Sequence, residues 1–182
     1  DAADARRTSE LAREVGFDNL SMDLILRLPK QEIGDVTRSI DDIVEWGAQQ
    51  IVYYDLSVHQ NTHYGVLQKQ GKLPLPPEEV HEAMFKVVEE RMEAAGFVHY
   101  EVATFARPGF ESRHNLIYWR NQPYLGVGPG AFSYIGGVRS VYAQTVSGYV
   151  RKALEGNWVP DEEDVLSVEE QQMETFLTGL RL

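Results

Sequence analysis

Hydrophobic positions along the chain follow two spacings. In some segments apolar residues repeat every three to four positions, as at Val36, Ile40 and Ile43, which is typical of a helix with one buried face. Between these segments lie short runs of apolar, β-branched and aromatic residues, which are typical of strands. In chain order the predicted elements are helix 4–15, strand 19–28, helix 33–47, strand 51–58, helix 78–96, strand 97–105, helix 145–154 and helix 168–180.

The alternation of strands and helices predicts an α/β fold with a parallel sheet. Three strands are too few to close an eight-stranded barrel, so we expect a partial barrel of the TIM type or an open sheet. In both architectures ligands bind at the carboxyl ends of the strands. The sequence places Arg27, His59, His63 and the stretch 105–133 at that edge.

Asp23 is the one carboxylate within the first strand run, whose near-continuous apolarity predicts a strand buried on both faces. A buried carboxylate costs several kcal/mol unless it is paired or hydrogen-bonded. Two interpretations follow. Asp23 either makes a hydrogen bond to a neighbouring loop or lines a cofactor pocket.

The stretch 105–133 combines aromatic residues, arginines and Gly-Pro breakers, and no uniform helix or strand period runs through it. It is either a binding segment or a large packed loop. Within it, His114 follows Arg113 and precedes Tyr118 and Trp119. An imidazole can ligate heme iron, aromatic rings can stack on the macrocycle and arginines can bind propionates. The alternative is a structural histidine.

Composition limits the possible partners and chemistry. The net charge of -11 argues against nucleic acid or an anionic membrane surface as the main partner. The chain has no cysteine, so it cannot supply thiolate ligands to zinc or to an iron–sulfur cluster. It has no apolar run of membrane-spanning length and no signal-like start, so we expect a cytoplasmic protein. Because the chain starts without methionine, inside a helical pattern, we also expect a fragment.

A divalent-metal site is a weaker hypothesis. Asp23, Asp55, His59 and His63 are candidate ligands. The H-x-x-x-H spacing suits metal binding only on a helix, and Gly65 argues against a helix here. A solvated loop is therefore the favoured interpretation.

Five motifs occur in the order and spacing of a known family: S-M-D-L-I-L-R-L-P-K-Q, H-Y-E-V-A-T-F-A-R-P-G, H-N-L-I-Y-W, Y-L-G-V-G-P-G-A-F-S and S-V-E-E-Q-Q-M-E-T-F-L-T-G-L-R. Over essentially all of its 182 residues the chain resembles the radical SAM family of oxygen-independent coproporphyrinogen III oxidase-like proteins. Within that family it looks closest to the HemW-like heme chaperone branch. One departure is L-R-L-P-K-Q, where the family usually has Y-G-L-P-G-Q.

The resemblance implies a fold and a set of site residues. The fold is a partial (β/α)6 barrel of parallel strands with a C-terminal accessory domain. The chain would divide into part of the barrel (1–104), an aromatic and arginine-rich loop region (105–143) and the start of the helical accessory region (144–182). The resemblance assigns heme-iron ligation and heme contact to His114, Arg113, Asn115, Tyr118 and Trp119, and S-adenosylmethionine contact to Asp23 and Leu56.

The implied function is heme or porphyrin binding by the parent protein, with delivery to a heme-accepting protein. The family's radical chemistry needs a [4Fe–4S] cluster on a C-x-x-x-C-x-x-C motif, so this chain alone is expected to be catalytically inactive. One alternative is an oxygen-independent coproporphyrinogen III oxidase, which decarboxylates its substrate. Another is a non-catalytic α/β scaffold for protein interaction. An open sheet edge would also allow a homodimer.

Overall fold

The computed structural model describes residues 2–182, which form two compact units. The N-terminal unit runs to Glu111, and the C-terminal unit is Ser112–Leu182. No helix within residues 2–182 has the length and apolarity needed to cross a membrane. The N-terminal unit consists of α1 (Ala2–Glu14), β1 (Ser21–Leu26), α2 (Ile33–Glu45), β2 (Gln50–Asp55), α3 (His63–Lys69), α4 (Glu78–Ala94), β3 (Val98–Glu101) and β4 (Thr104–Ala106).

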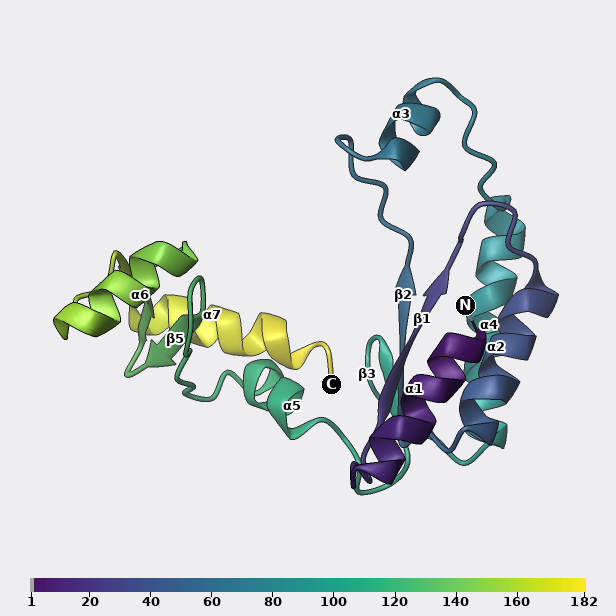
Figure 1. Cartoon of the computed structure of the whole chain (residues 1–182), viewed down its shortest axis with the longest axis horizontal. Helices are drawn as coiled ribbons and strands as arrows, with labels where there is room; N and C mark the ends of the chain where they lie inside the picture. Colours follow the sequence, from purple (N-terminus) through teal and green to yellow (C-terminus); the bar gives the residue numbers. More distant parts are fainter. Residues whose placement is uncertain (1) are drawn as a thin grey trace. The chain divides into compact units, whose positions relative to one another are not determined.

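The N-terminal unit is built on a four-stranded sheet with the strand order β1-β2-β4-β3. The strands β1 and β2 are parallel, as predicted, and Asp23 is paired with Val52. Helices α2 and α4 pack against each other and lie along the same face of this sheet (Figure 1). The core between helices and sheet consists of Leu24, Leu26, Val36, Ile40, Ile43, Ala48, Ile51, Tyr53, Met84, Val88, Met92, Phe97 and Phe105.

The first strand is buried on one face only, so the prediction of burial on both faces is wrong. Leu24 and Leu26 point into the core, whereas Asp23 before them and Ile25 between them are exposed. Side chains alternate across a strand, and α2 and α4 cover one side of it. The carboxylate of Asp23 therefore lies on the exposed face and needs no buried partner.

The run 97–105 is also different from the prediction, because it forms a hairpin rather than one parallel strand. β3 and β4 are antiparallel, joined by a turn at Val102 and Ala103, and β4 pairs antiparallel with β2. The run contains no Gly, Pro or Asn that would signal a turn. Instead the buried Glu101 carboxylate accepts hydrogen bonds from the Ala103 backbone N–H and the Thr104 hydroxyl, which stabilises the reversal.

The segment after β2 contains the short helix α3, which Gly65 was expected to prevent. Thr62 caps this helix by accepting a hydrogen bond from the Gly65 backbone N–H at 3.2 Å. A Cβ at position 65 would lie 2.3 Å from the carbonyl oxygen of His59. Glycine is therefore required at this position because the preceding loop folds closely over the first turn.

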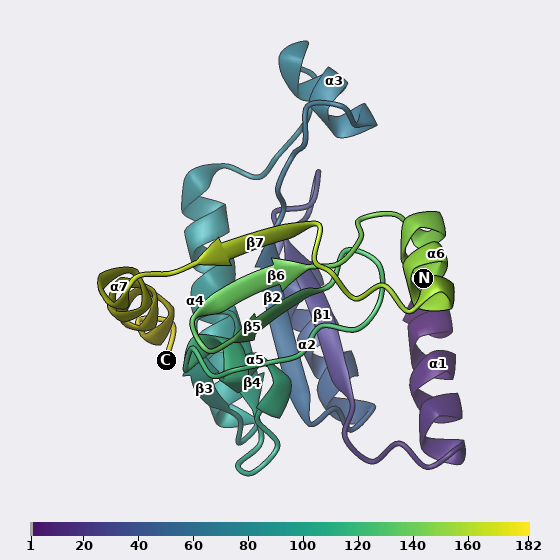
Figure 2. The same cartoon turned by 90° about the vertical axis from the view of Figure 1, so that its left-hand side faces the viewer.

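The C-terminal unit consists of α5 (Arg113–Trp119), β5 (Phe132–Ile135), β6 (Val138–Val141), α6 (Val146–Glu155), β7 (Glu162–Val165) and α7 (Val168–Gly179). The strands form an antiparallel sheet in the order β5-β6-β7 (Figure 2). Helices α6 and α7 confirm the sequence prediction. The region 105–143, expected to be a loop, contains α5, β5 and β6, because each of its regular elements is short enough to fit between the Pro and Gly breakers.

Candidate functional site

Helix α5 carries the H-N-L-I-Y-W motif, and both of its ends are closed by local hydrogen bonds. At the start, the Ser112 hydroxyl accepts a hydrogen bond from the Asn115 backbone N–H at 3.2 Å. At the end, Asn121 has a left-handed backbone with φ of 47°, and its N–H donates to the Tyr118 carbonyl at 3.0 Å. A short helix with two closed ends gives its side chains fixed directions.

His114 is exposed and begins a row of aromatic rings. Its ring meets Tyr118 edge to face, with centroids 4.8 Å apart and an interplanar angle of 86°. Tyr118 meets Tyr124 at 4.7 Å, and Tyr124 in turn lies 6.3 Å from Tyr134. The backbones of Tyr124 and Tyr134 are also joined by two hydrogen bonds of 2.9 Å. The row therefore connects the imidazole of His114 to strand β5.

The imidazole of His114 makes no hydrogen bond or ion pair with any other residue in 2–182. Edge-to-face packing on Tyr118 restricts the ring without engaging its nitrogens. A neutral imidazole nitrogen with no protein partner can act as a ligand to a metal. The imidazole of His114 is thus available as a ligand to a metal.

Trp119 lies in a different environment from Tyr118. The guanidinium of Arg181 sits 4.1 Å from the centre of its ring, and the indole is half-buried. Tyr118 follows His114 by four residues and shares its side of the helix, whereas Trp119 and Asn115 lie on other sides. The structure therefore brings Tyr118, but not Trp119, to the ring of His114.

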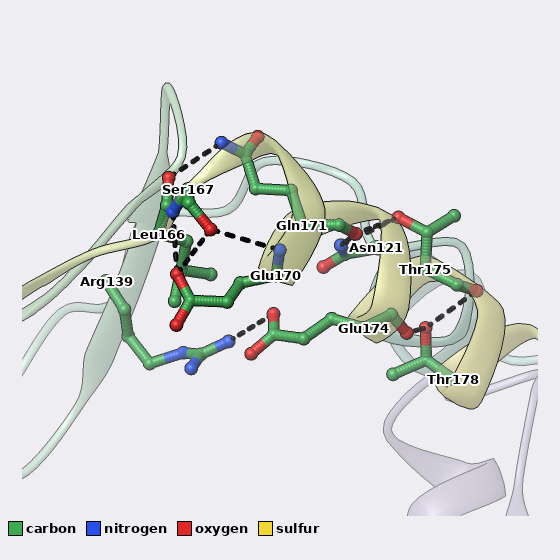
Figure 3. A network of polar contacts seen from close by, with 9 residues as sticks. All are labelled: Asn121, Arg139, Leu166, Ser167, Glu170, Gln171, Glu174, Thr175 and Thr178. Carbon is green, nitrogen blue, oxygen red and sulfur yellow. Dashed lines mark hydrogen bonds and ion pairs between the residues drawn. The ribbon is translucent and has the colours of Figure 1, made fainter.

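A polar network ties this region to helix α7 (Figure 3). The Nδ2 group of Asn121 donates to the Thr175 hydroxyl at 3.0 Å, and Arg139 donates to Glu174 at 2.9 Å. The hydrogen bond to Glu174 raises the pKa of the Arg139 guanidinium, and Tyr124 adds to this shift. The guanidinium also lies 5.8 Å from the centre of the Tyr134 ring. These contacts hold the far end of the aromatic row in place.

In the N-terminal unit, Asp23 on β1 and Leu56, the residue after β2, lie on the same face of the sheet. Asp23 pairs with Val52, so Leu56 lies four residues further toward the carboxyl end. At about 3.3 Å per residue, this is a separation of roughly 13 Å along the strand direction. The two residues therefore do not touch, and they could only contact different parts of one extended ligand.

The carboxyl ends of β1 and β2 carry a cluster of charged and titratable side chains, of which the sequence singled out Arg27, at this edge, and Asp55, as a candidate metal ligand. Arg27 lies 3.7 Å from Asp55, and the Nε2 atom of the buried His81 lies 3.0 Å from the same carboxylate. Glu78 lies 3.5 Å from the Nδ1 atom of His81. The spacing of Glu78 and His81 on the first turn of a helix is the signal that could have pointed to them.

No group of three or more His, Asp or Glu side chains suited to a metal ion occurs in residues 2–182. His63 begins α3 and His59 precedes it, so the two histidines do not share a helix.

Comparisons with known proteins place the chain in a family. The heme chaperone HemW of Bacillus subtilis is 39% identical over 94% of this chain and 45% of its own length. HemW of Lactococcus lactis is 34% identical over the same shares. The solved structure of Escherichia coli coproporphyrinogen III oxidase (HemN), described as a radical SAM enzyme, matches all of this chain and 44% of that chain. Its TM-score is 0.74 at 18% identity, which shows a common fold.

The chain belongs to the HemN/HemW-like radical SAM family. No family model matches it. The chain spans about half the length of the curated relatives it matches, at 45% of each of the two HemW proteins. The fold that this chain shares with HemN contains the N-terminal mixed α/β unit, in which strands β1 and β2 are parallel.

Proposed function

We propose that the protein to which this chain belongs binds heme and delivers it to a heme-accepting protein, with His114 as the ligand to the iron. The HemW relatives, at 34% and 39% identity, are named heme chaperones. The region that carries the proposed ligand is the H-N-L-I-Y-W helix α5.

The observation that carries the proposal is the exposed, unpaired imidazole of His114 packed edge to face on Tyr118. Heme offers an iron that takes an imidazole ligand, an apolar macrocycle and two carboxylates. Each part meets a matching group on α5, since an imidazole, a tyrosine ring and the exposed Arg113 lie close together in sequence. Trp119 lies under the guanidinium of Arg181, and the Asn115 backbone N–H donates to the Ser112 hydroxyl at the start of the helix.

The role of the N-terminal unit is a further part of the proposal. The full-length protein would complete a partial (β/α)6 barrel and would carry the [4Fe–4S] cluster outside this chain. Asp23 and Leu56 would then contact S-adenosylmethionine from the sheet face opposite α2 and α4. The separation of the two residues along the strands suits an extended ligand with a polar and an apolar end.

Delivery can be tested with apomyoglobin as the acceptor. The chain is loaded with hemin, freed of excess hemin by gel filtration and mixed with apomyoglobin, and the absorbance of myoglobin is followed. We expect complete transfer from the wild-type chain, whereas the His114→Ala variant, which lacks the proposed iron ligand, should leave gel filtration without hemin and transfer none. A wild-type chain that keeps no hemin through gel filtration, or never releases it, contradicts the proposal.

The fold shared with HemN favours a second candidate function, the oxidative decarboxylation of coproporphyrinogen III. The test is to supply the full-length protein, with its cluster reconstituted and reduced, with S-adenosylmethionine, coproporphyrinogen III and an electron acceptor. Release of carbon dioxide and formation of protoporphyrinogen would support the oxidase. Turnover of neither compound, together with stable hemin binding, would support the chaperone.

A further inference from the structure

Nine of the twelve arginines in residues 2–182 have a partner for the guanidinium group. They pair with carboxylates, donate to backbone carbonyls or lie over aromatic rings. The exceptions in this part of the chain are Arg113, Arg120 and Arg151. Acidic residues outnumber basic ones by 28 to 17, so unpaired guanidinium groups are unexpected. Two of the exceptions lie on or at the end of α5.

Arg113 and Arg120 lie on the same side of α5. They are seven residues apart, which is about two helical turns and about 10.5 Å along the axis. Arg120 is the C-cap residue, and its backbone N–H still donates to the Leu116 carbonyl, so it belongs to the last turn. Both side chains are exposed. The half-buried Ile117 lies between them on the same side.

The order of side chains around α5 is the second observation. His114 lies about 100° around the axis from Arg113, and Tyr118 follows about 40° beyond His114. The imidazole is therefore flanked by the two cations and Ile117 on one side and by the aromatic row on the other. A ligand with carboxylates on one edge and apolar groups on the opposite edge would therefore contact matching side chains on the two sides of His114.

We propose that Arg113 and Arg120 form a two-point carboxylate clamp, which fixes the direction in which a dicarboxylate tetrapyrrole lies on α5. The inference rests on the proposed heme binding at His114 and assigns a residue, Arg120, that lies outside the H-N-L-I-Y-W motif. The two guanidinium groups bind the two propionates, and the apolar edge of the macrocycle lies toward Tyr118. The clamp makes the site selective for free-acid porphyrins over their neutral esters.

The size of the effect follows from the exposure of both side chains. Exposed charge pairs are weak, so each substitution to glutamine should raise the hemin dissociation constant by about threefold to tenfold. The double variant should show roughly the product of the two effects. The loss should shrink in high salt because exposed charges are screened.

The test compares Arg113→Gln, Arg120→Gln and the double variant with the matched control Arg151→Gln, which removes the unpaired arginine of α6. Each protein is titrated with hemin and with hemin dimethyl ester, and dissociation constants are taken from the Soret absorbance. We expect the two α5 variants to lose affinity for hemin only, and the control to match the wild type with both probes. Circular dichroism confirms that each variant is folded.

Two results would overturn the clamp while leaving the proposed function in place. One is equal affinity of the wild type for hemin and its ester with an intact dependence on His114. The other is an equal loss in the α5 variants and in the Arg151→Gln control, which would indicate a general effect of net charge. A wild-type chain that binds neither probe would overturn both the clamp and the proposed function.

Discussion

Asn121 combines two roles, and replacing it separates them. Its left-handed backbone, with φ of 47°, closes α5, and its side chain donates to the Thr175 hydroxyl at 3.0 Å (Figure 3). Asn121→Ala removes the hydrogen bond and places a residue with a Cβ and no local hydrogen-bonding group in the left-handed region. Asn121→Gly removes the same hydrogen bond, but glycine adopts the left-handed conformation without steric strain.

The expected loss of stability follows from two contributions, the hydrogen bond and the left-handed backbone. An exposed neutral hydrogen bond contributes about 0.5–1 kcal/mol. A left-handed conformation costs an ordinary L-residue about 1–2 kcal/mol, of which asparagine already bears a part. We therefore expect Asn121→Gly to lower the free energy of unfolding of the C-terminal unit by about 0.5–1 kcal/mol and Asn121→Ala by about 1.5–2 kcal/mol.

The assay is urea unfolding in a background with Trp46 and Trp158 replaced by phenylalanine. The fluorescence of Trp119, which lies under Arg181, then reports on the contact between α5 and α7. The prediction depends on the difference between the two variants. If Asn121→Ala unfolds at the same urea concentration as Asn121→Gly, the left-handed cap does not limit stability and the reasoning is refuted.

Three further perturbations have defined outcomes. Burial raises the pKa of Tyr53, whose hydroxyl donates to the Val102 carbonyl, so its stabilising contribution is present below pH 10 and is lost as pH rises through the folded pKa. Tyr53→Phe should cost about 1 kcal/mol at neutral pH and flatten the alkaline side of a thermal-unfolding profile. Hydrogen bonds from Ser167 lower the pKa of Glu170, so the stability that the ionised Glu170 carboxylate contributes is lost as pH falls through its folded pKa. Ser167→Ala removes the hydroxyl of this pair and should weaken the dependence of α7 helicity on acid pH, measured by circular dichroism. Lys30 has φ of 63°, so Lys30→Val should destabilise by about 1–2 kcal/mol in urea unfolding, whereas Lys30→Gly should not. A Val variant as stable as the Gly variant would contradict the last prediction.

The fold could be predicted wherever apolar spacing was strong. Helix α2 repeats buried residues at positions 36, 40 and 43, and the parallel pairing of β1 with β2 follows from the helix between them. The β3–β4 hairpin could not be predicted, because its turn depends on the Glu101 carboxylate and contains no Gly, Pro or Asn. Strand β7 was missed since its four residues are all exposed, and only backbone pairing with β6 defines it.

The candidate site was predictable in its centre but not in its surroundings. The sequence singled out His114 and Tyr118, but helix α5, which places the two rings together, was not predicted because the stretch was expected to be a loop. Tyr124, Tyr134 and Arg139 come from segments that only the tertiary fold brings to α5. Arg27 and Lys30, which stand where the family usually has glycine, both have left-handed backbones. The carboxylates that pair with Arg27 come from β2 and α4, so only the tertiary fold shows them.

Hemin binding through His114 is the central claim, and a Soret titration tests it most directly. The wild-type chain is compared with His114→Ala and with the control His59→Ala, which removes an exposed histidine of the other unit. We predict a saturable Soret shift for the wild type and the control, and loss of that shift for His114→Ala. Identical titrations of all three proteins would show that His114 is not the iron ligand and would contradict the account.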